Sequence, residues 1–298
     1  MLEAEIQLVK GGADSLPATR WRRFPSVWSL MRCRFRASRW PKLCVLLGSL
    51  LVGATYSTGA GALEVLVFSK VAEGAYRHSS IPAGIAALHE IGAAKGWQVD
   101  DTIDNGLFTA ANLARYDVVV WNNTGGDVLD VSQRAAFEGF IRHGGGYVGI
   151  HEAAAGAGSR VAVNWPWYEK LVGAYFKQHP AGTPTARIVV SSTRHPSTRG
   201  LPNPWTRTDE WYEWIENPTS KDGLQILLYV DEKSYNNGLG RHPIAWCHEF
   251  EGGRSFYTAM GHTEASYSED RFRAHLAGGI EWASAHSPNL TSTSGKRR

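Results

Sequence analysis

Residues 144–156 of this 298-residue chain read Gly144-Gly145-Gly146-Tyr147-Val148-Gly149-Ile150-His151-Glu152-Ala153-Ala154-Ala155-Gly156. The first part of this stretch has the small and apolar side chains of a short buried strand, and His151 and Glu152 stand at its carboxyl end. The small residues that follow favour a sharp turn. Ligands bind outside the carboxyl ends of the strands in an open α/β sheet, so the stretch indicates where a functional site would lie.

Strand and helix patterns alternate in the chain that leads to this stretch. Apolar, β-branched runs predict strands at residues 63–69, 97–100 and 116–122, and helical spacing predicts helices at residues 81–95, 108–113 and 131–143. Strands and helices joined in turn by short loops are typical of a parallel sheet with helices on both faces. The chain shows no internal repeat and no clear linker, so we expect one domain.

The pattern changes after His151. Helices are predicted at residues 165–172 and 269–285, and strands at residues 186–191, 210–215, 225–230, 244–250 and 255–259. We expect these later strands to extend the sheet and decorate its rim. The predicted fold is therefore an α/β domain at residues 63–286, with a mostly parallel sheet, helices on both faces and extra C-terminal strands. The tail at residues 287–298 is rich in Ser, Thr, Lys and Arg and is predicted to be disordered.

The first 62 residues have the pattern of a signal peptide. Basic residues precede an apolar run at residues 43–54, and the small residues Ala60-Gly61-Ala62 fit a cleavage site. The basic segment is long for a leader, and a start at Met31 would give the usual length. The apolar run is short for a membrane span, although an uncleaved anchor is the alternative. We therefore expect an exported protein, periplasmic or secreted, that meets the membrane only through its export signal.

Charge and cysteine content exclude two classes of protein. The chain has 31 basic and 28 acidic residues, of which nine and three lie in residues 1–62, so the remainder carries a net charge of about −3. Nucleic acid is an unfavourable partner for a body that has no basic stripe. Removal of the leader leaves Cys247 as the one cysteine, so a disulfide-stapled scaffold is excluded.

Short motifs along the body resemble the ThuA-like (trehalose utilisation) family. They are VLVFS at residues 65–69, YRH at 76–78, GGGYVGIH at 144–151, HP at 179–180 and 195–196, DEWY at 209–212, HPIAW at 242–246 and FYTAMGH at 256–262. The resemblance implies a flavodoxin-like fold of the class I glutamine amidotransferase type. It also implies a role in sugar metabolism, with trehalose or a related glucoside as the small-molecule partner.

The resemblance also changes the expected chemistry. The amidotransferase relatives carry a nucleophilic Cys on the turn after the glycine-rich strand, where this chain has His151, so glutaminase activity is not expected. The relatives also place a His-x-Glu pair after a late strand, which corresponds here to His262 and Glu264. We expect His151, His262 and Glu264 to act in general acid–base catalysis. Glu152 is a further catalytic candidate that would raise the pKa of His151, or else a favourable charge at a helix N-terminus.

Three histidines are candidates for a metal site. His78 follows the first predicted strand, so it should meet His151 and His262 at the carboxyl edge of the sheet. Three imidazoles can bind a divalent metal such as zinc and leave an open position. Sugar hydroxyls are the alternative ligands of these rings, and a buried structural role is the alternative for His151. The sequence contains no HxH or HExxH motif, so histidine spacing does not decide between a metal site, a sugar site and a structural role.

The candidates for substrate binding are His78, Asn122, His179, Asp209, Glu210 and Trp211. Carbohydrate sites combine aromatic faces with carboxylates that bind hydroxyls or transfer protons, and the DEWY motif supplies both. The alternatives are a half-buried strand at residues 210–215 and a structural rim histidine at position 179. The function that we expect is a sugar hydrolase or lyase. A non-catalytic sugar-binding module and a partner subunit of a sugar oxidoreductase are the alternatives.

Overall fold

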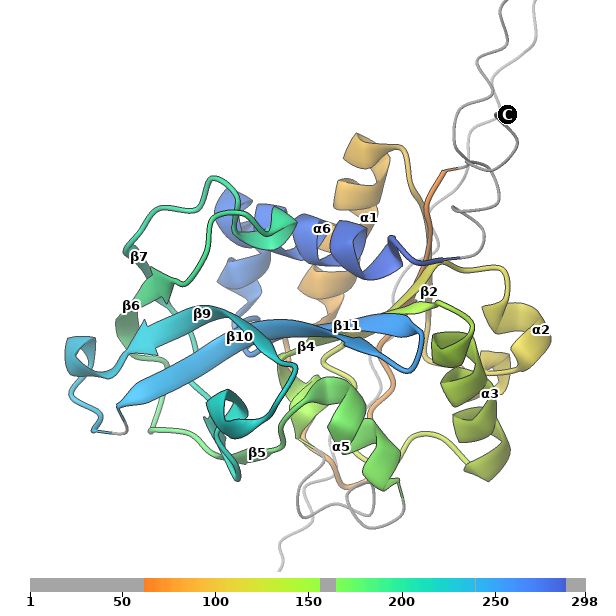
Figure 1. The fold of residues 1–298 in the computed structure, drawn as a ribbon, viewed down its shortest axis with the longest axis horizontal. Coiled ribbons are helices and arrows are strands. Elements are labelled where there is room, and N and C mark those ends of the chain that lie inside the picture. The colour runs from red at the N-terminus through yellow and green to blue at the C-terminus, as the bar shows by residue number, and fades with distance from the viewer. Residues whose placement is uncertain (1–61, 156–164, 239, 288–298) are drawn as a thin grey trace, which may run out of the picture. The chain divides into compact units, whose positions relative to one another are not determined.

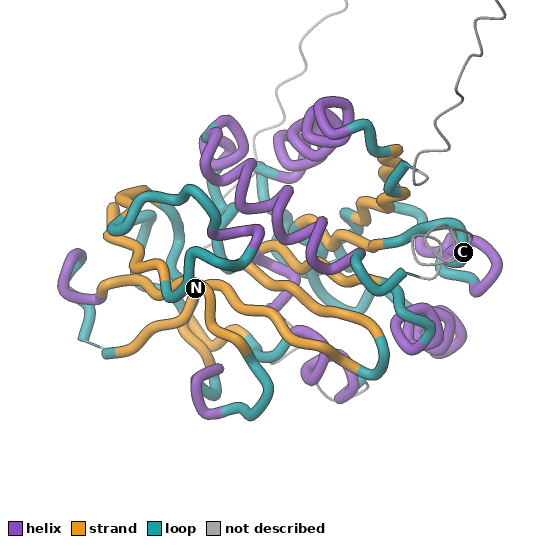
Figure 2. The backbone as a smooth tube through the Cα atoms, turned by 45° about the horizontal axis from the view of Figure 1, so that its top comes forward, coloured by secondary structure: helices purple, strands orange, loops and turns teal. Residues whose placement is uncertain are grey.

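The computed structural model describes residues 62–155, 165–238 and 240–287. A nine-stranded sheet runs through these residues in the order β2-β1-β3-β4-β11-β10-β9-β6-β7. Figure 2 shows its strands side by side, with helices on both faces. Residues 1–61 and 288–298 lie outside the described residues, so the signal peptide expected at residues 1–62 and the disordered tail expected at residues 287–298 remain predictions.

Five parallel strands form one half of the sheet. They are β2 (Gln98–Thr102), β1 (Glu64–Phe68), β3 (Val118–Asn122), β4 (Gly146–Ile150) and β11 (Gly253–Thr258). The strands β3 and β4 are buried at every residue because helices cover both of their faces. This strand order is that of a flavodoxin-like sheet, and all five strands end at one edge. The flavodoxin-like fold of the class I glutamine amidotransferase type is confirmed.

Four antiparallel strands extend the sheet beyond β11. They are β10 (Arg241–Phe250), β9 (Gln225–Asp231), β6 (Thr185–Val190) and β7 (Trp205–Thr208). A separate two-stranded sheet pairs β5 (Phe176–Gln178) with β8 (Glu213–Trp214). The extra C-terminal strands predicted from the sequence are therefore present.

Helices cover the two faces of the large sheet. The helices α1 (Ile81–Lys95) and α6 (Asp270–Ser284) lie on one face, and α3 (Val131–Arg142) and α5 (Pro166–Val172) lie on the other (Figure 1). The short helix α2 (Ala110–Leu113) packs beside α3. The 3-10 helices are η1 (Asn105–Leu107), η2 (His151–Ala154), η3 (Pro196–Thr198), η4 (Pro218–Ser220), η5 (Glu232–Ser234) and η6 (Glu264–Ser268). No helix of the described residues is long and apolar enough to cross a membrane.

The region around residues 205–215 differs from the prediction. The predicted strand at residues 210–215 is wrong, because only Glu213 and Trp214 pair, whereas Trp205–Thr208 forms a strand that was not predicted. The chain leaves the sheet after Thr208 because the buried Asp209 carboxylate accepts hydrogen bonds from backbone amides, including that of Glu210. Residues 209–212 therefore form a connection that crosses the carboxyl edge of the sheet.

Candidate functional site

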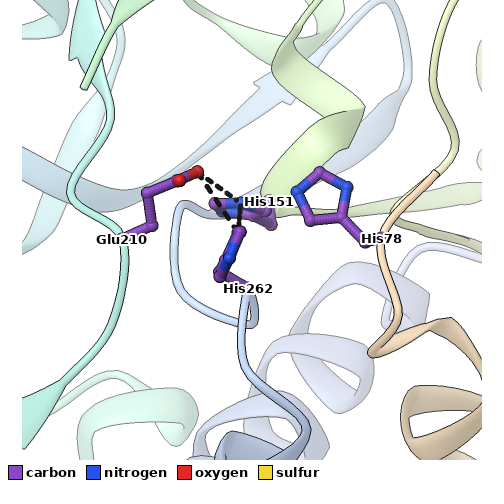
Figure 3. A group of neighbouring side chains, drawn as sticks. All are labelled: His78, His151, Glu210 and His262. Atoms are coloured by element: carbon purple, nitrogen blue, oxygen red, sulfur yellow. Dashed lines mark hydrogen bonds and ion pairs between the residues drawn. The ribbon is translucent and has the colours of Figure 1, made fainter. Parts of the chain in front are cut away.

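Four side chains converge at the carboxyl edge of the sheet. Figure 3 shows His78, His151, Glu210 and His262 pointing toward one another from four separate segments. One potential ligand atom from each residue lies within 4.8 Å of the corresponding atoms of the other three. His78, His151 and His262 follow β1, β4 and β11, and Glu210 arrives from the connection after β7. Parallel strands that end at one edge thus bring distant residues together.

His151 stands on a sharp turn between β4 and the 3-10 helix η2. Its φ of 49° lies in the left-handed region, which is costly for a residue with a Cβ. The ring of His151 is fully buried, and its Nδ1 lies 2.6 Å from the carbonyl oxygen of Ala259. The Tyr212 ring packs against it at a centroid distance of 4.0 Å, and Tyr257 Oη donates to the His151 carbonyl at 2.8 Å. These contacts fix the direction in which the imidazole Nε2 points.

The loop that carries His262 is held by a buried ion pair. The carboxylate of Asp209 accepts hydrogen bonds from the backbone amides of Gly261 at 2.9 Å and His262 at 3.0 Å. The Arg207 guanidinium lies 3.2 Å from the same carboxylate. On the other side, the Ser80 hydroxyl donates to the Gly261 carbonyl at 3.0 Å. Asp209 therefore positions the loop from within and is not available to a sugar hydroxyl.

Glu210 is the carboxylate that joins the histidines. Its Oε2 lies 3.3 Å from His151 Nε2 and 3.3 Å from His262 Nδ1, and its Oε1 lies 3.2 Å from His179 Nε2. Burial raises the pKa of Glu210, but the close contacts with the His151 and His262 rings outweigh burial and hold the pKa well below its usual range. The same contact with Glu210 raises the pKa of His262. Glu210 is therefore ionised at neutral pH.

His78 and Glu152 complete the inner wall of the site. Burial, followed by the neighbouring His151 and His262, lowers the pKa of His78 to about 3, so this ring is neutral at pH 7. Its buried Nδ1 has no hydrogen-bond partner and lies 3.9 Å from Glu152 Oε2. Glu152 accepts a hydrogen bond from Tyr212 Oη at 3.0 Å, and burial raises its pKa to about 7.

The site opens to solvent on one side. His78 and His151 are buried, whereas the side chains of His262 and His179 are 25% and 36% exposed. A substrate would therefore approach from the side of His262 and His179. Glu210 contacts both of these rings, and its side chain is 9% exposed.

Besides Asp209, three predicted site residues lie elsewhere or make other contacts. Glu264 is exposed at the start of η6, and Glu210 is the carboxylate that contacts His262 in its place. Trp211 is fully buried, and its indole nitrogen donates to the Pro184 carbonyl. Asn122 is buried too, where its amide donates to Ser69 and to the Ile81 carbonyl. The packing of Trp211 and Asn122 leaves neither of them free for a substrate.

Two contributors to the site were not predicted. Tyr212 stacks on His151 and hydrogen-bonds Glu152, and the carbonyl of Ala259 accepts from the His151 ring. The DEWY motif contains Tyr212, so its position beside Glu210 was a usable signal. The sequence has no signal for a backbone carbonyl, because every residue carries one.

The family of this chain is identified by a sequence match that covers most of its length. A family model, ThuA, described as trehalose utilisation, matches residues 64–283. The chain belongs to the ThuA family. A comparison with curated proteins found no match.

Solved structures with the same fold include two described as ThuA-like. The protein of Bacteroides uniformis is 24% identical with a TM-score of 0.66, and the match covers 78% of this chain and 94% of that one. The protein of Parabacteroides merdae is 21% identical with a TM-score of 0.59, over 76% of this chain and 91% of that one. A cytoplasmic protein of Salmonella typhimurium is 12% identical with a TM-score of 0.55, over 74% and 99%. At these identities the structures establish that the ThuA fold is shared.

Proposed function

We propose that this ThuA-family protein is an enzyme that cleaves a sugar linkage at the cluster of His78, His151, Glu210 and His262. The substrate is trehalose, a related glucoside or a keto derivative of one, and cleavage proceeds by hydrolysis or elimination. The observation that carries the proposal is the convergence of three imidazoles and a carboxylate at a half-open point on the carboxyl edge. An export signal in residues 1–62 would place this activity outside the cytoplasm.

Cleavage of a glycosidic bond requires a group that delivers a proton to the leaving oxygen and a group that activates water or removes a proton. The site offers two carboxylates, Glu152 and Glu210, within a few ångströms of histidine rings. Tyr212 holds Glu152 from the buried side, and His179 holds Glu210 from the open side. Such fixed orientation is the main requirement for efficient proton transfer.

Thiol chemistry does not compete with this proposal. Cys247 is the one cysteine of the described residues, and burial raises the pKa of its thiol to about 12. Its sulfur lies in β10, 3.6 Å from His195, rather than at the turn after β4. A neutral, buried thiol is inert at physiological pH, so the amidotransferase mechanism has no nucleophile at this site.

The test is a cleavage assay on a panel that contains trehalose, other glucosides and their keto derivatives. We expect turnover of at least one member, and a loss of about 100-fold or more in kcat/KM for Glu210→Gln. The matched control is Glu90→Gln, which removes an exposed carboxylate that pairs with Arg273 and is not part of the site. Control and wild-type rates should agree within about 2-fold.

Two results would contradict the proposal. The first is an unchanged rate in Glu210→Gln on a substrate that the wild type cleaves. The second is saturable sugar binding without cleavage of any panel member, which would identify a sugar-binding module. Circular dichroism of each variant distinguishes loss of the catalytic group from loss of the fold.

A further inference from the structure

We propose that His78, His151, Glu210 and His262 bind a single divalent transition metal ion, for which Zn²⁺ is the best fit. The site itself rests on geometry alone, whereas its catalytic role rests on the function proposed above. Among residues 62–155, 165–238 and 240–287, these four side chains are the set grouped closely enough to share one ion. The set contains three imidazoles and one carboxylate, which suit Zn²⁺ and similar ions.

Hydrogen-bond accounting at His151 calls for a cation. The Ala259 carbonyl can only accept, so His151 Nδ1 must be the donor at 2.6 Å. In a neutral ring, Nε2 then carries a lone pair. That lone pair faces Glu210 Oε2 at 3.3 Å, where the carboxylate also offers only lone pairs. Two acceptors that face each other in a buried site are unfavourable unless a positive charge, either a second proton on the His151 ring or a metal ion, lies between them.

His262 does not resolve this conflict by itself. Its Nδ1 lies 3.3 Å from His151 Nε2 and 3.3 Å from Glu210 Oε2. A ring nitrogen carries at most one proton, so it can satisfy only one of these two acceptors. A metal ion accepts a lone pair from all three atoms at once. The three atoms therefore make better sense as metal ligands than as hydrogen-bond partners.

The spacing of these three atoms matches a tetrahedral ion. Bonds of about 2.0–2.1 Å to Zn²⁺ in tetrahedral geometry place neighbouring ligand atoms about 3.3–3.4 Å apart. The three observed separations between His151 Nε2, His262 Nδ1 and Glu210 Oε2 are each 3.3 Å. An octahedral ion with bonds of the same length would bring neighbouring ligand atoms to about 2.9 Å. The observed triangle is thus one face of a Zn²⁺ tetrahedron.

His78 supplies the fourth metal ligand. Its ring centroid lies 4.8 Å from that of His151 and 5.0 Å from that of His262, and the planes are close to perpendicular. One of its ring nitrogens points toward the other three residues in Figure 3. Its Nδ1 is buried without a hydrogen bond and faces Glu152 at 3.9 Å. A proton on Nδ1, directed toward that carboxylate, leaves the Nε2 lone pair for the metal.

Outer partners hold the ligands in the manner of known metal sites. Ligating histidines usually donate their other nitrogen to a carbonyl or carboxylate, and ligating carboxylates are themselves hydrogen-bonded. Here the Ala259 carbonyl holds His151, Glu152 lies beside His78, and His179 contacts the second oxygen of Glu210. A bound ion would polarise a sugar oxygen or a water molecule, which is the chemistry that a cleavage reaction needs.

The test measures metal binding directly, on the purified full chain after treatment with a chelator. Calorimetric titration with Zn²⁺ should give one ion per chain, and binding should raise the melting temperature. Titration with Co²⁺ should produce the strong visible absorption of a tetrahedral site. Wild-type protein that binds neither ion above background would overturn the inference.

Variants assign the ligands. We expect His262→Ala and Glu210→Gln to weaken Zn²⁺ binding more than about 100-fold, and His179→Ala to weaken it about 10–100-fold while the stoichiometry stays at one. The control is His89→Ala, since His89 is an exposed histidine that pairs with Asp101. Unchanged affinity in both His262→Ala and Glu210→Gln would contradict the assignment. Because His262 and Glu210 border the opening, these variants disturb the fold less than a change at His151.

The metal inference and the proposed function fail in different ways. Stoichiometric Zn²⁺ binding without cleavage of any sugar would uphold the site and reject the function. Cleavage of a sugar by protein that binds neither Zn²⁺ nor Co²⁺ would uphold the function and reject the site.

Discussion

At the scale of single residues, Asp209 and Arg207 form the buried ion pair that supports the loop of His262. Asp209 is fully buried and accepts hydrogen bonds from three backbone amides, from Ser266 and from Arg207. Removal of one member of such a pair leaves the other charge buried without compensation. We therefore predict that Asp209→Ala lowers the free energy of unfolding by about 3–5 kcal/mol, measured by urea denaturation.

The conservative change at the same position should have a smaller effect. An asparagine side chain would keep one accepting oxygen, so Asp209→Asn should cost less than Asp209→Ala and retain more of the fold. The control is Asp222→Ala, which alters an exposed turn and should change stability by less than about 0.5 kcal/mol. Equal stability of Asp209→Ala and wild type would show that the pair contributes nothing to the loop.

The same scale shows what the sequence could predict of the site. His78, His151 and His262 each follow a parallel strand, and the carboxyl ends of such strands meet at one edge, so their convergence was foreseeable. The His-x-Glu pair of the amidotransferase relatives suggested Glu264 as the partner carboxylate, whereas Glu264 is exposed at the start of η6. Glu210 takes that place because its connection crosses the edge from an antiparallel strand, whose position in the sheet no local pattern reveals.

At the scale of elements, replacement of a helical glycine by alanine should change stability in opposite directions at two positions. A Cβ on Gly278 of α6 would lie 2.4 Å from backbone atoms of Pro196 and Ser197, which cannot move aside easily. A Cβ on Gly139 of α3 would meet nothing within 4 Å. We predict that Gly278→Ala destabilises the protein by about 1–3 kcal/mol through overpacking. Gly139→Ala should stabilise it by about 0.5–1 kcal/mol through helix propensity.

The stabilities of Gly278→Ala and Gly139→Ala are best compared by thermal and urea unfolding under the same conditions. Each glycine is the control for the other, because the chemical change and the helical setting are the same. Stabilisation by Gly278→Ala would mean that α6 stands farther from η3 than the contacts between them indicate.

Elements differ in how well local sequence predicts them. Long patterns such as the helix at Val131–Arg142 and the buried strand Val118–Asn122 match the structure closely, because burial on one or both faces imposes a clear period. The strands Phe176–Gln178 and Glu213–Trp214 are too short to show any period. Their pairing depends on tertiary contacts between distant segments, which the local pattern does not contain.

At the scale of the whole molecule, neutral buried histidines make stability depend on pH. Burial, together with a nearby cation, lowers the pKa of His275 to about 3 and that of His195 to about 4; the cation is Arg207 for His275 and Arg254 for His195. Unfolding releases both rings to water, where the pKa is about 6.5. Between about pH 6.5 and pH 4 the unfolded chain therefore binds protons that the folded chain does not, so stability falls as the pH is lowered.

His275→Gln provides the test of this acid sensitivity. Each such histidine contributes up to about 1.4 kcal/mol per pH unit to the slope of unfolding free energy against pH. His275 is fully buried and its Nδ1 donates to the Ser197 carbonyl, so glutamine can keep a donor there without a titrating group. Urea denaturation at pH 7, 6 and 5 should give a shallower slope for the variant than for the wild type, even if the variant is less stable at pH 7. Since Glu152 and the other titrating groups are common to both proteins, they cancel in the difference between the slopes. Identical slopes would mean that His275 binds its proton equally in the folded and unfolded chains, contrary to its burial.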